Sequence, residues 1–260
     1  MPSGDLSGEY IAGRNLVEEA LKAGSRVKKV IIESEIKAKG YSNDVRIRDI
    51  IAIALKKGIP VSYMPRLEMR KIEREIGVKG GGICAQVGIE EEIGFKEFFA
   101  HFTKKNKEAF FIILHDILYE ENLGSILRSS AAGGVDCVII SNREKRGLTA
   151  KVRQVSMGGS EYVPLVRDNL FTVLDILKKE GIKTVGVELS GKSWYYDEEL
   201  RGSVAFILGG ESAGVTDPLL KRCDSIVKLP MLRSIQSLNV SVSAGIIIYE
   251  KIRQECQTYE

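Results

Sequence analysis

The stretch AFFIILHDILYEENLGSILRSSAAGGVDCVIIS (109–141) carries the two periodicities that decide the fold. It opens with AFFIILH (109–115), an almost continuous apolar run that is typical of a parallel strand buried on both faces. A helical pattern over 123–132 follows and ends at Gly133-Gly134, and a second apolar strand begins at 136. A strand, a helix and a second strand in this order predict a parallel sheet with crossover helices.

The same alternation continues towards the C-terminus. Further strands are expected at 161–166, 183–189, 203–209 and 225–230, and further helices at 149–157, 170–180 and 237–254. We therefore predict an α/β domain over 109–260, built on a doubly wound parallel sheet.

The first 90 residues form a separate, smaller α/β pattern. Apolar residues at helical spacing predict a helix near 44–57, with Asn43 as its N-cap and Gly58 beyond its end. Strands are expected at 27–34, 59–64 and 81–89. Residues 91–108 are charge-rich around FKEFFAHF, and we interpret them as a linker with one short helix whose phenylalanines dock on a domain.

Composition excludes several classes of protein. The chain of 260 residues is 44% hydrophobic and 28% charged, as in ordinary globular proteins. No apolar run approaches the roughly 20 residues of a membrane span, and the N-terminus lacks a secretory pattern, so we expect a cytoplasmic protein without membrane contact. The 4 cysteines form no C-x-x-C pair and only 2 histidines accompany them, so no metal site is predicted and the thiols are expected to be free and buried.

The charge is unevenly distributed. Residues 1–90 hold 16 Lys and Arg against 12 Asp and Glu, whereas residues 109–260 hold 18 against 19. This excess is compatible both with a solvated surface and with RNA contact. A basic stretch after the strand at 136–141 is the other candidate for binding the RNA backbone, again with solvated surface as the alternative. Its members are Arg143, Lys145, Arg146, Lys151 and Arg153.

Three segments lie where strands of the second domain end, which is where open parallel sheets bind ligands. They are HDILYEENLGSILRS (115–129), LGGESAGV (208–215) and KLPMLRSIQSLNVSVSAG (228–245). Taken singly, each has a structural explanation, because Asn122 and Ser237 could cap helices and Gly209-Gly210 could form a turn. Neither G-x-G-x-x-G after the first strand nor G-x-x-x-x-G-K-[ST] is present, which argues against a dinucleotide or nucleoside triphosphate site.

Taken together, the segments resemble the three signature motifs of the SpoU family of RNA methyltransferases. These are N-x-G-x-x-x-R (122–128), G-x-E (209–211), and L-P-M (229–231) followed by S-L-N-V-S-V-S (237–243). The resemblance covers 109–255, and the first domain is similar to the L30e-like substrate-binding domain of many members. It implies a SPOUT domain with a deep trefoil knot from about Ser203 onward, and a homodimer formed through it. It also implies transfer of methyl from S-adenosyl-L-methionine to a ribose 2′-hydroxyl, and the pairing of the two domains most resembles the enzymes that methylate a guanosine in 23S ribosomal RNA.

The resemblance also implies roles for individual residues. Arg128 would hold the target phosphate and 2′-oxygen, with deprotonation through water, since a guanidinium is a poor base. The residues implied to act in catalysis are Asn122, Arg128, Glu211, Ser237 and Asn239. The residues implied to hold the cofactor are Gly209, Gly210, Leu229, Met231 and Leu238. Gly209 and Gly210 lack a Cβ and would let the backbone approach the ligand closely.

Three other functions stay open. One is the same reaction on transfer RNA, although relatives of that kind often lack the first domain. Another is a resistance-type enzyme that methylates an adenosine in ribosomal RNA. The last is an RNA-binding assembly factor without catalysis, which the joint presence of the five implied catalytic residues disfavours.

Overall fold

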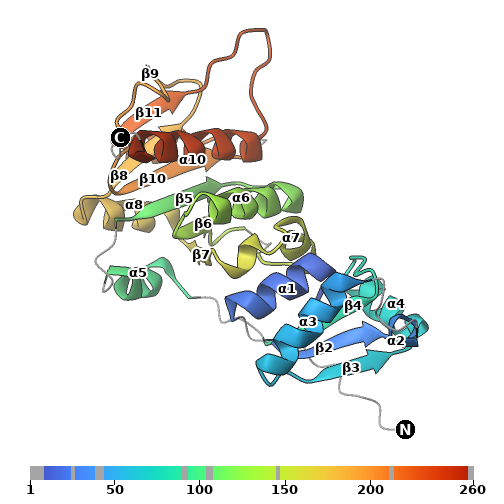
Figure 1. The fold of residues 1–260 in the computed structure, drawn as a ribbon. Coiled ribbons are helices and arrows are strands. Elements are labelled where there is room, and N and C mark those ends of the chain that lie inside the picture. Colours follow the sequence, from blue (N-terminus) through green and yellow to red (C-terminus); the bar gives the residue numbers. More distant parts are fainter. Residues whose placement is uncertain are drawn as a thin grey trace. The chain divides into compact units, whose positions relative to one another are not determined.

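The computed structural model describes residues 9–24, 27–38, 44–88, 93–103, 108–144, 147–210 and 214–256. Contacts within the chain divide it into two units (Figure 1). The first combines Met1–Glu91 with Leu148–Tyr162, and the second combines Glu92–Gly147 with Val163–Glu260. The segment 148–162 therefore groups with the first unit, whereas the sequence predicted one continuous domain over 109–260.

The first unit is built on a four-stranded sheet in the order β1-β4-β2-β3. Its strands are β1 (Glu9–Ala12), β2 (Val27–Glu33), β3 (Val61–Met64) and β4 (Ile83–Val87). Its helices are α1 (Arg14–Ala23), α2 (Ser34–Ala38), α3 (Val45–Lys56), α4 (Arg66–Glu75) and α7 (Ala150–Val155), with a 3-10 turn η1 (Gly159–Glu161). β4 pairs antiparallel with β1 and β2, while β2 and β3 run parallel.

Two apolar clusters fill this unit. In one, Leu16 and Val17 of α1 and Ile47 and Ile50 of α3 pack with buried strand residues. In the other, Met69 and Ile72 of α4 are among the buried side chains. The N-cap of α3 is Asp44, whose Oδ1 accepts a hydrogen bond from the backbone N–H of Ile47 at 3.3 Å. The predicted cap, Asn43, lies outside the described residues.

The second unit confirms the predicted α/β fold with a parallel sheet. Seven strands lie in the order β7-β6-β5-β10-β8-β11-β9, and every pairing is parallel. They are β5 (Phe110–His115), β6 (Cys137–Ser141), β7 (Leu165–Asp168), β8 (Lys183–Val187), β9 (Ser193–Trp194), β10 (Val204–Gly209) and β11 (Ser225–Lys228). β10 comes late in the chain yet lies between β5 and β8, at the centre of the sheet.

Helices cover this sheet. They are α5 (Phe95–Thr103), α6 (Glu120–Ala132), α8 (Leu170–Lys179), α9 (Asp217–Leu220) and α10 (Val240–Cys256). α10 packs against α6, and the two lie side by side in Figure 1. The same view shows the chain leaving the sheet after β11 in an extended loop before it returns to α10.

The phenylalanines of α5 dock on the second unit, as the sequence predicted. Phe95 is fully buried and Phe99 is 7% exposed, and both belong to the cluster that holds Phe111 of β5. The rings of Phe95 and Phe111 meet edge to face at 5.7 Å between centroids. The segment predicted as a linker therefore supplies part of the core. Among the described residues, no helix is long and apolar enough to cross a membrane.

Candidate active site

A cavity of about 630 Å³ opens at the carboxyl ends of β8, β10 and β11. This edge of a parallel sheet is where ligands bind in open α/β folds. The residues predicted to bind a cofactor all line it, namely Gly209, Gly210, Leu229, Met231 and Leu238. Ser237 and Asn239, predicted to act in catalysis, line it as well. The structure thus gathers two motifs that are separated in the sequence.

Gly209 and Gly210 end the central strand, and the chain crosses itself closely there. A Cβ added to Gly209 would overlap the backbone of Gly214 and Val215, and one added to Gly210 would overlap the carbonyl of Asp116. The N–H of Gly210 donates to the carbonyl oxygen of His115 at 2.8 Å. Glycine is required at both positions because other backbone segments of this chain pass close to them. The sequence predicted a different reason, close approach of the backbone to a ligand.

Glu188 follows β8 directly and lines the same cavity, although sequence reasoning did not select it. Its Oε2 accepts a hydrogen bond from the N–H of Val215 at 3.0 Å, which ties the end of β8 to the turn after β10. Gly214 in that turn has φ +62°, and an added Cβ there would overlap the Glu188 carboxylate. An acidic residue immediately after a parallel strand was the sequence signal that could have identified it.

Asn122 and Asn239 join the first motif to the third. The Nδ2 of Asn239 donates to the Oδ1 of Asn122 at 2.9 Å across 117 positions of sequence. The Oδ1 of Asn239 in turn accepts from the backbone N–H of Ser241 at 2.9 Å and from its hydroxyl at 2.6 Å. Asn239, rather than Ser237, therefore caps α10. Asn122 is buried, so this contact fixes the start of α6 against the cavity wall.

Arg128 and Glu211 are not joined to this group. Arg128 is exposed on α6, about 9 Å along the helix axis from Asn122, and does not line the cavity. Among the described residues, its guanidinium has no hydrogen bond or ion pair. Glu211 lies outside the described residues. Of the five predicted catalytic residues, the structure brings together Asn122, Ser237 and Asn239.

The structure describes three members of the predicted RNA-binding stretch, Arg143, Lys151 and Arg153. Arg143 is exposed in the second unit, Lys151 belongs to α7 of the first, and Lys145 and Arg146 lie outside the described residues. Arg153 was predicted to contact RNA, and this prediction is wrong. It is 7% exposed, and its Nη1 donates to the Glu161 carboxylate at 3.1 Å. Breaking a buried pair of this kind costs about 3–5 kcal/mol, so Arg153 holds η1 to α7.

The cysteines carry no reactive thiolate at the site. Burial, aided by Glu73, raises the pKa of Cys84 to about 12. Burial, aided by Asp224, raises the pKa of Cys223 to about 12. Cys84 and Cys137 are buried as expected, Cys223 is half-buried, and Cys256 is exposed, contrary to expectation. Within the described ranges, no group of three or more His, Cys, Asp or Glu side chains is placed to hold a metal ion.

Two family models match the chain. The SpoU rRNA Methylase family matches residues 109–249, which is more than half of the chain. The model described as RNA 2′-O ribose methyltransferase substrate binding matches residues 10–92. A putative TrmH family tRNA/rRNA methyltransferase of Bacillus subtilis, YacO, is 32% identical over 247 residues, covering 95% of this chain and 96% of its own.

Solved structures share the fold. The SpoU methyltransferase AviRb of Streptomyces viridochromogenes, in complex with AdoMet, has a TM-score of 0.77 at 20% identity, covering 96% of this chain and 91% of its own. An AdoMet-bound rRNA methyltransferase of Sinorhizobium meliloti has a TM-score of 0.72 at 19% identity, covering 94% and 86%. A TrmH/SpoU tRNA modifying enzyme of A. aeolicus has a TM-score of 0.53 at 25% identity, covering 63% and 85%. With both domain models and a full-length relative in agreement, the chain belongs to the SpoU rRNA methylase family and is an RNA methyltransferase.

Proposed function

We propose that the protein transfers a methyl group from S-adenosyl-L-methionine to the ribose 2′-hydroxyl of a guanosine in 23S ribosomal RNA. The observation that carries this proposal is the cavity at the carboxyl edge of the sheet. It collects Gly209, Leu229 and Asn239 from separate motifs, and Asn239 bonds to Asn122.

The cavity suits S-adenosyl-L-methionine in size and in chemistry. Its volume of about 630 Å³ falls within the range of roughly 300–1,000 Å³ usual for small-molecule sites. Leu229 and Leu238 offer apolar walls for an adenine ring, and the Glu188 carboxylate offers an acceptor for ribose hydroxyls. The bound cofactor would supply a methyl group on a sulfonium, and AviRb and the Sinorhizobium enzyme bind the same compound.

The protein's part in the reaction is to align the nucleotide and to stabilise the oxygen that is methylated. Alignment of reacting groups can contribute on the order of 7–11 kcal/mol. The 2′-oxygen would give its proton to water and form a bond to the methyl carbon, while the bond from that carbon to the sulfonium sulfur breaks and leaves a neutral thioether. Arg128 is exposed and unpaired among the described residues, so a phosphate and the developing oxyanion can reach its guanidinium. The Asn122–Asn239 bond would hold α6, and with it Arg128, in register with the cavity.

Ribosomal RNA is favoured over transfer RNA by the first unit. The Sinorhizobium rRNA methyltransferase aligns over 94% of this chain, whereas the tRNA modifying enzyme of A. aeolicus aligns over 63%. A separate substrate-binding match at 10–92 supports a role for the first unit in holding a large RNA. Methylation of transfer RNA, or of an adenosine in ribosomal RNA, is the alternative within the same chemistry.

We also propose that the second unit is knotted and that two copies of the protein form a homodimer through it. Val242 and Tyr249 lie seven residues apart on α10 and are 50% and 54% exposed, so they form an apolar strip that a second copy could cover. Light scattering on the purified protein should give twice the monomer mass of 28.8 kDa.

Mapping the methylated atom tests the proposal. Ribosomal RNA from cells without the gene, treated with protein and labelled cofactor, should gain one alkali-resistant dinucleotide, because a 2′-O-methyl group blocks cleavage at its own 3′ phosphodiester. Mass spectrometry should assign the methyl to a guanosine ribose. A methyl on a nucleobase would refute the proposed chemistry, and RNA binding without any transfer would identify a non-catalytic assembly factor.

A further inference from the structure

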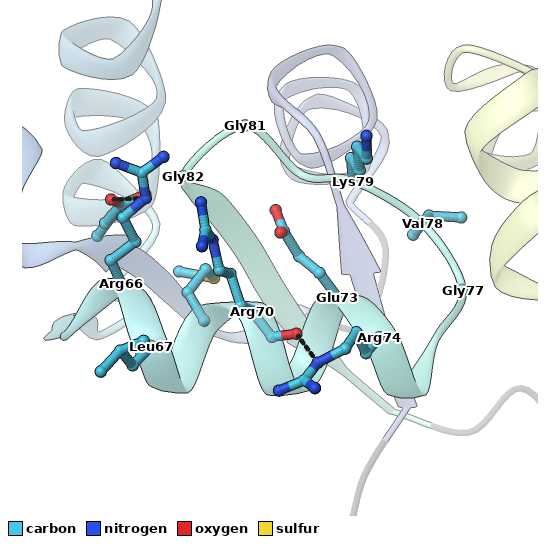
Figure 2. A pocket seen from close by; sticks show the side chains of 12 residues that line it. Arg66, Leu67, Arg70, Glu73, Arg74, Gly77, Val78, Lys79, Gly81 and Gly82 are labelled. Carbon is cyan, nitrogen blue, oxygen red and sulfur yellow. Dashed lines mark hydrogen bonds and ion pairs between the residues drawn. The ribbon is translucent and has the colours of Figure 1, made fainter.

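A second, larger cavity of about 980 Å³ lies entirely within the first unit. One wall is α4, and the other is the loop 77–82 that leads into β4 (Figure 2). This cavity shares no lining residue with the cavity at the edge of the seven-stranded sheet. The side chains around it are mainly cationic, with Arg66, Arg70 and Arg74 from the helix and Lys79 from the loop.

The three arginines follow one another at four-residue spacing, which aligns them along one side of α4 with about 6 Å between successive positions. Figure 2 shows Arg66 and Arg70 rising from the helix towards the loop, while Arg74 runs back along it. The Nε of Arg74 donates to the carbonyl oxygen of Arg70 at 3.3 Å. The Arg70 guanidinium itself is exposed and has no partner among the described residues.

The two acidic side chains at the cavity are already engaged. The Glu33 carboxylate lies 3.6 Å from the Nε of Arg66. Glu73 accepts a hydrogen bond from the N–H of Gly80 at 2.7 Å, which fixes the loop to α4. Arg70 and Lys79 form no ion pair in the described part of the chain, and with Arg74 they outnumber the one unpaired carboxylate of the lining, Glu73, so the cavity can accept an anionic ligand.

The loop adds neutral donors to these cations. Gly77, Gly81 and Gly82 have φ of +70°, +60° and +85°, conformations that L side chains rarely adopt. Gly81 is exposed, and its N–H has no hydrogen-bond partner in the described structure. Backbone N–H groups in a glycine-rich turn form anion-binding concavities. Arg70, Lys79 and the N–H of Gly81 are thus unengaged donors, which suits a phosphate diester because its oxygens accept hydrogen bonds.

The surroundings favour nucleic acid over an acidic protein. Protein interfaces have an apolar centre, but Met69 and Val78 at this cavity are buried and only Leu67, 74% exposed, offers apolar surface among the described lining residues. Guanidinium groups bind phosphate with two parallel hydrogen bonds, and phosphate contacts dominate the affinity of proteins for nucleic acids.

We propose that the cavity between α4 and the loop 77–82 binds the phosphate backbone of the RNA substrate, with Arg70 and Lys79 as the main contacts. This inference rests on the proposed function, because it takes the substrate to be ribosomal RNA. Contacts of this kind fix the register of the RNA without reading its sequence. The cavity would therefore position the RNA, and the second unit would carry out the reaction.

Charge reversal in the full-length protein tests the site. The probe is unmodified 23S ribosomal RNA transcribed in vitro, with affinity measured between 50 and 200 mM salt. Arg70→Glu and Lys79→Glu should each weaken binding about tenfold or more, and Arg70→Ala should reduce the salt slope by about 0.7–0.9, as expected for one lost phosphate contact. Lys71→Glu is the matched control, since Lys71 is exposed on the same helix, does not line the cavity, and should change affinity less than twofold.

Methyl transfer is measured on the same variants. Arg70→Glu should raise the RNA concentration needed for half-maximal rate and leave the rate at saturating RNA unchanged. Equal affinities and salt slopes for Arg70→Glu, Lys71→Glu and the wild type would overturn the proposed RNA site. The same result is expected if the cavity binds an acidic protein instead of RNA. If the wild type transfers no methyl but Arg70→Glu still loses affinity relative to Lys71→Glu, the proposed reaction fails and the site stands.

Discussion

The two cavities of this molecule are built from different parts of the chain. At the sheet edge of the second unit, the walls are glycine backbone, apolar side chains and uncharged amides, and Glu188 is the one charged residue among the described residues of the lining. Beside α4 in the first unit, exposed arginines form the wall. A site made by chain crossings should be sensitive to added volume, whereas a site made by exposed cations should be sensitive to charge and salt.

Arg128 gives the sharpest test of this contrast, because it is a cation that belongs to the second unit. Arg128→Ala should lower methyl transfer by about 100–1,000-fold, the usual effect of losing one oxyanion donor. Binding of S-adenosylmethionine, measured by calorimetry, should stay nearly unchanged because Arg128 does not line the cavity. Arg222→Ala, at an exposed arginine paired with Asp175, is the control. Normal turnover in Arg128→Ala would remove Arg128 from the reaction.

Added volume at the sheet edge should be the next largest effect. Gly209→Val should weaken cofactor binding by about tenfold or more and lower the thermal midpoint, because its side chain would displace the backbone at Gly214 and Val215. Gly245→Ala is the matched control. No heavy atom lies within 4 Å of the Cβ added at Gly245 in α10, so this change should stabilise the protein by about 0.5–1 kcal/mol. Unchanged affinity in Gly209→Val would place the cofactor elsewhere.

The amide pair that joins the motifs should have a smaller, measurable coupling. In a double-mutant cycle, Asn122→Ala and Asn239→Ala should show an interaction energy of about 1 kcal/mol by urea unfolding. Asn169→Ala is the control, because Asn169 caps α8 through the N–H of Phe171 and does not touch Asn122. It should cost about 1 kcal/mol by itself and add to Asn122→Ala without coupling. Additivity in the Asn122–Asn239 cycle would mean that this bond does not hold the site together.

The smallest expected effect is on the free energy of unfolding, from an ion pair within the second unit. Arg253 donates to both oxygens of Glu250 and, with Gln254 and against the effect of burial, lowers the pKa of that carboxyl. A lowered folded-state pKa contributes stability above the unfolded pKa of about 4.3, and this contribution is lost as pH falls through the folded value. Glu250→Gln should therefore lower the free energy of unfolding at pH 7 by less than about 1 kcal/mol, with a smaller difference near pH 3.5. In an Arg253→Ala background, that pH dependence should shrink.

Much of the fold could be predicted from the sequence because local patterns determined it. Continuous apolar runs gave the parallel strands, and all five residues expected to hold a cofactor line one cavity. Gly209 and Leu229 meet because both follow strands, and carboxyl ends share one edge of a parallel sheet. Their function as cofactor ligands stays a prediction.

The remaining features depend on tertiary contacts that no local pattern carries. Arg153 belongs to a basic stretch, and nothing in the sequence of that stretch shows that its guanidinium is buried in an ion pair with Glu161. The Asn122–Asn239 bond joins positions 117 residues apart. Phe95 lies in a charge-rich segment that resembles a linker, yet it is fully buried in the core of the second unit. A truncation that removes α5 would therefore lose core packing of the second unit.

The late position of β10 also shapes how the protein is made. The N-terminal end of β10 lies beside the start of β5. There the Ser203 hydroxyl accepts a hydrogen bond from the N–H of Ala109, 94 residues earlier. At a synthesis rate of about 5–20 residues per second, the ribosome needs on the order of 5 to 20 seconds to cover that distance. During this interval, β5 lacks its central neighbour and the nascent sheet exposes apolar strand edges, which are prone to aggregation. Synthesis of the strand that carries Gly209 therefore also ends the interval in which this edge of β5 is unpaired.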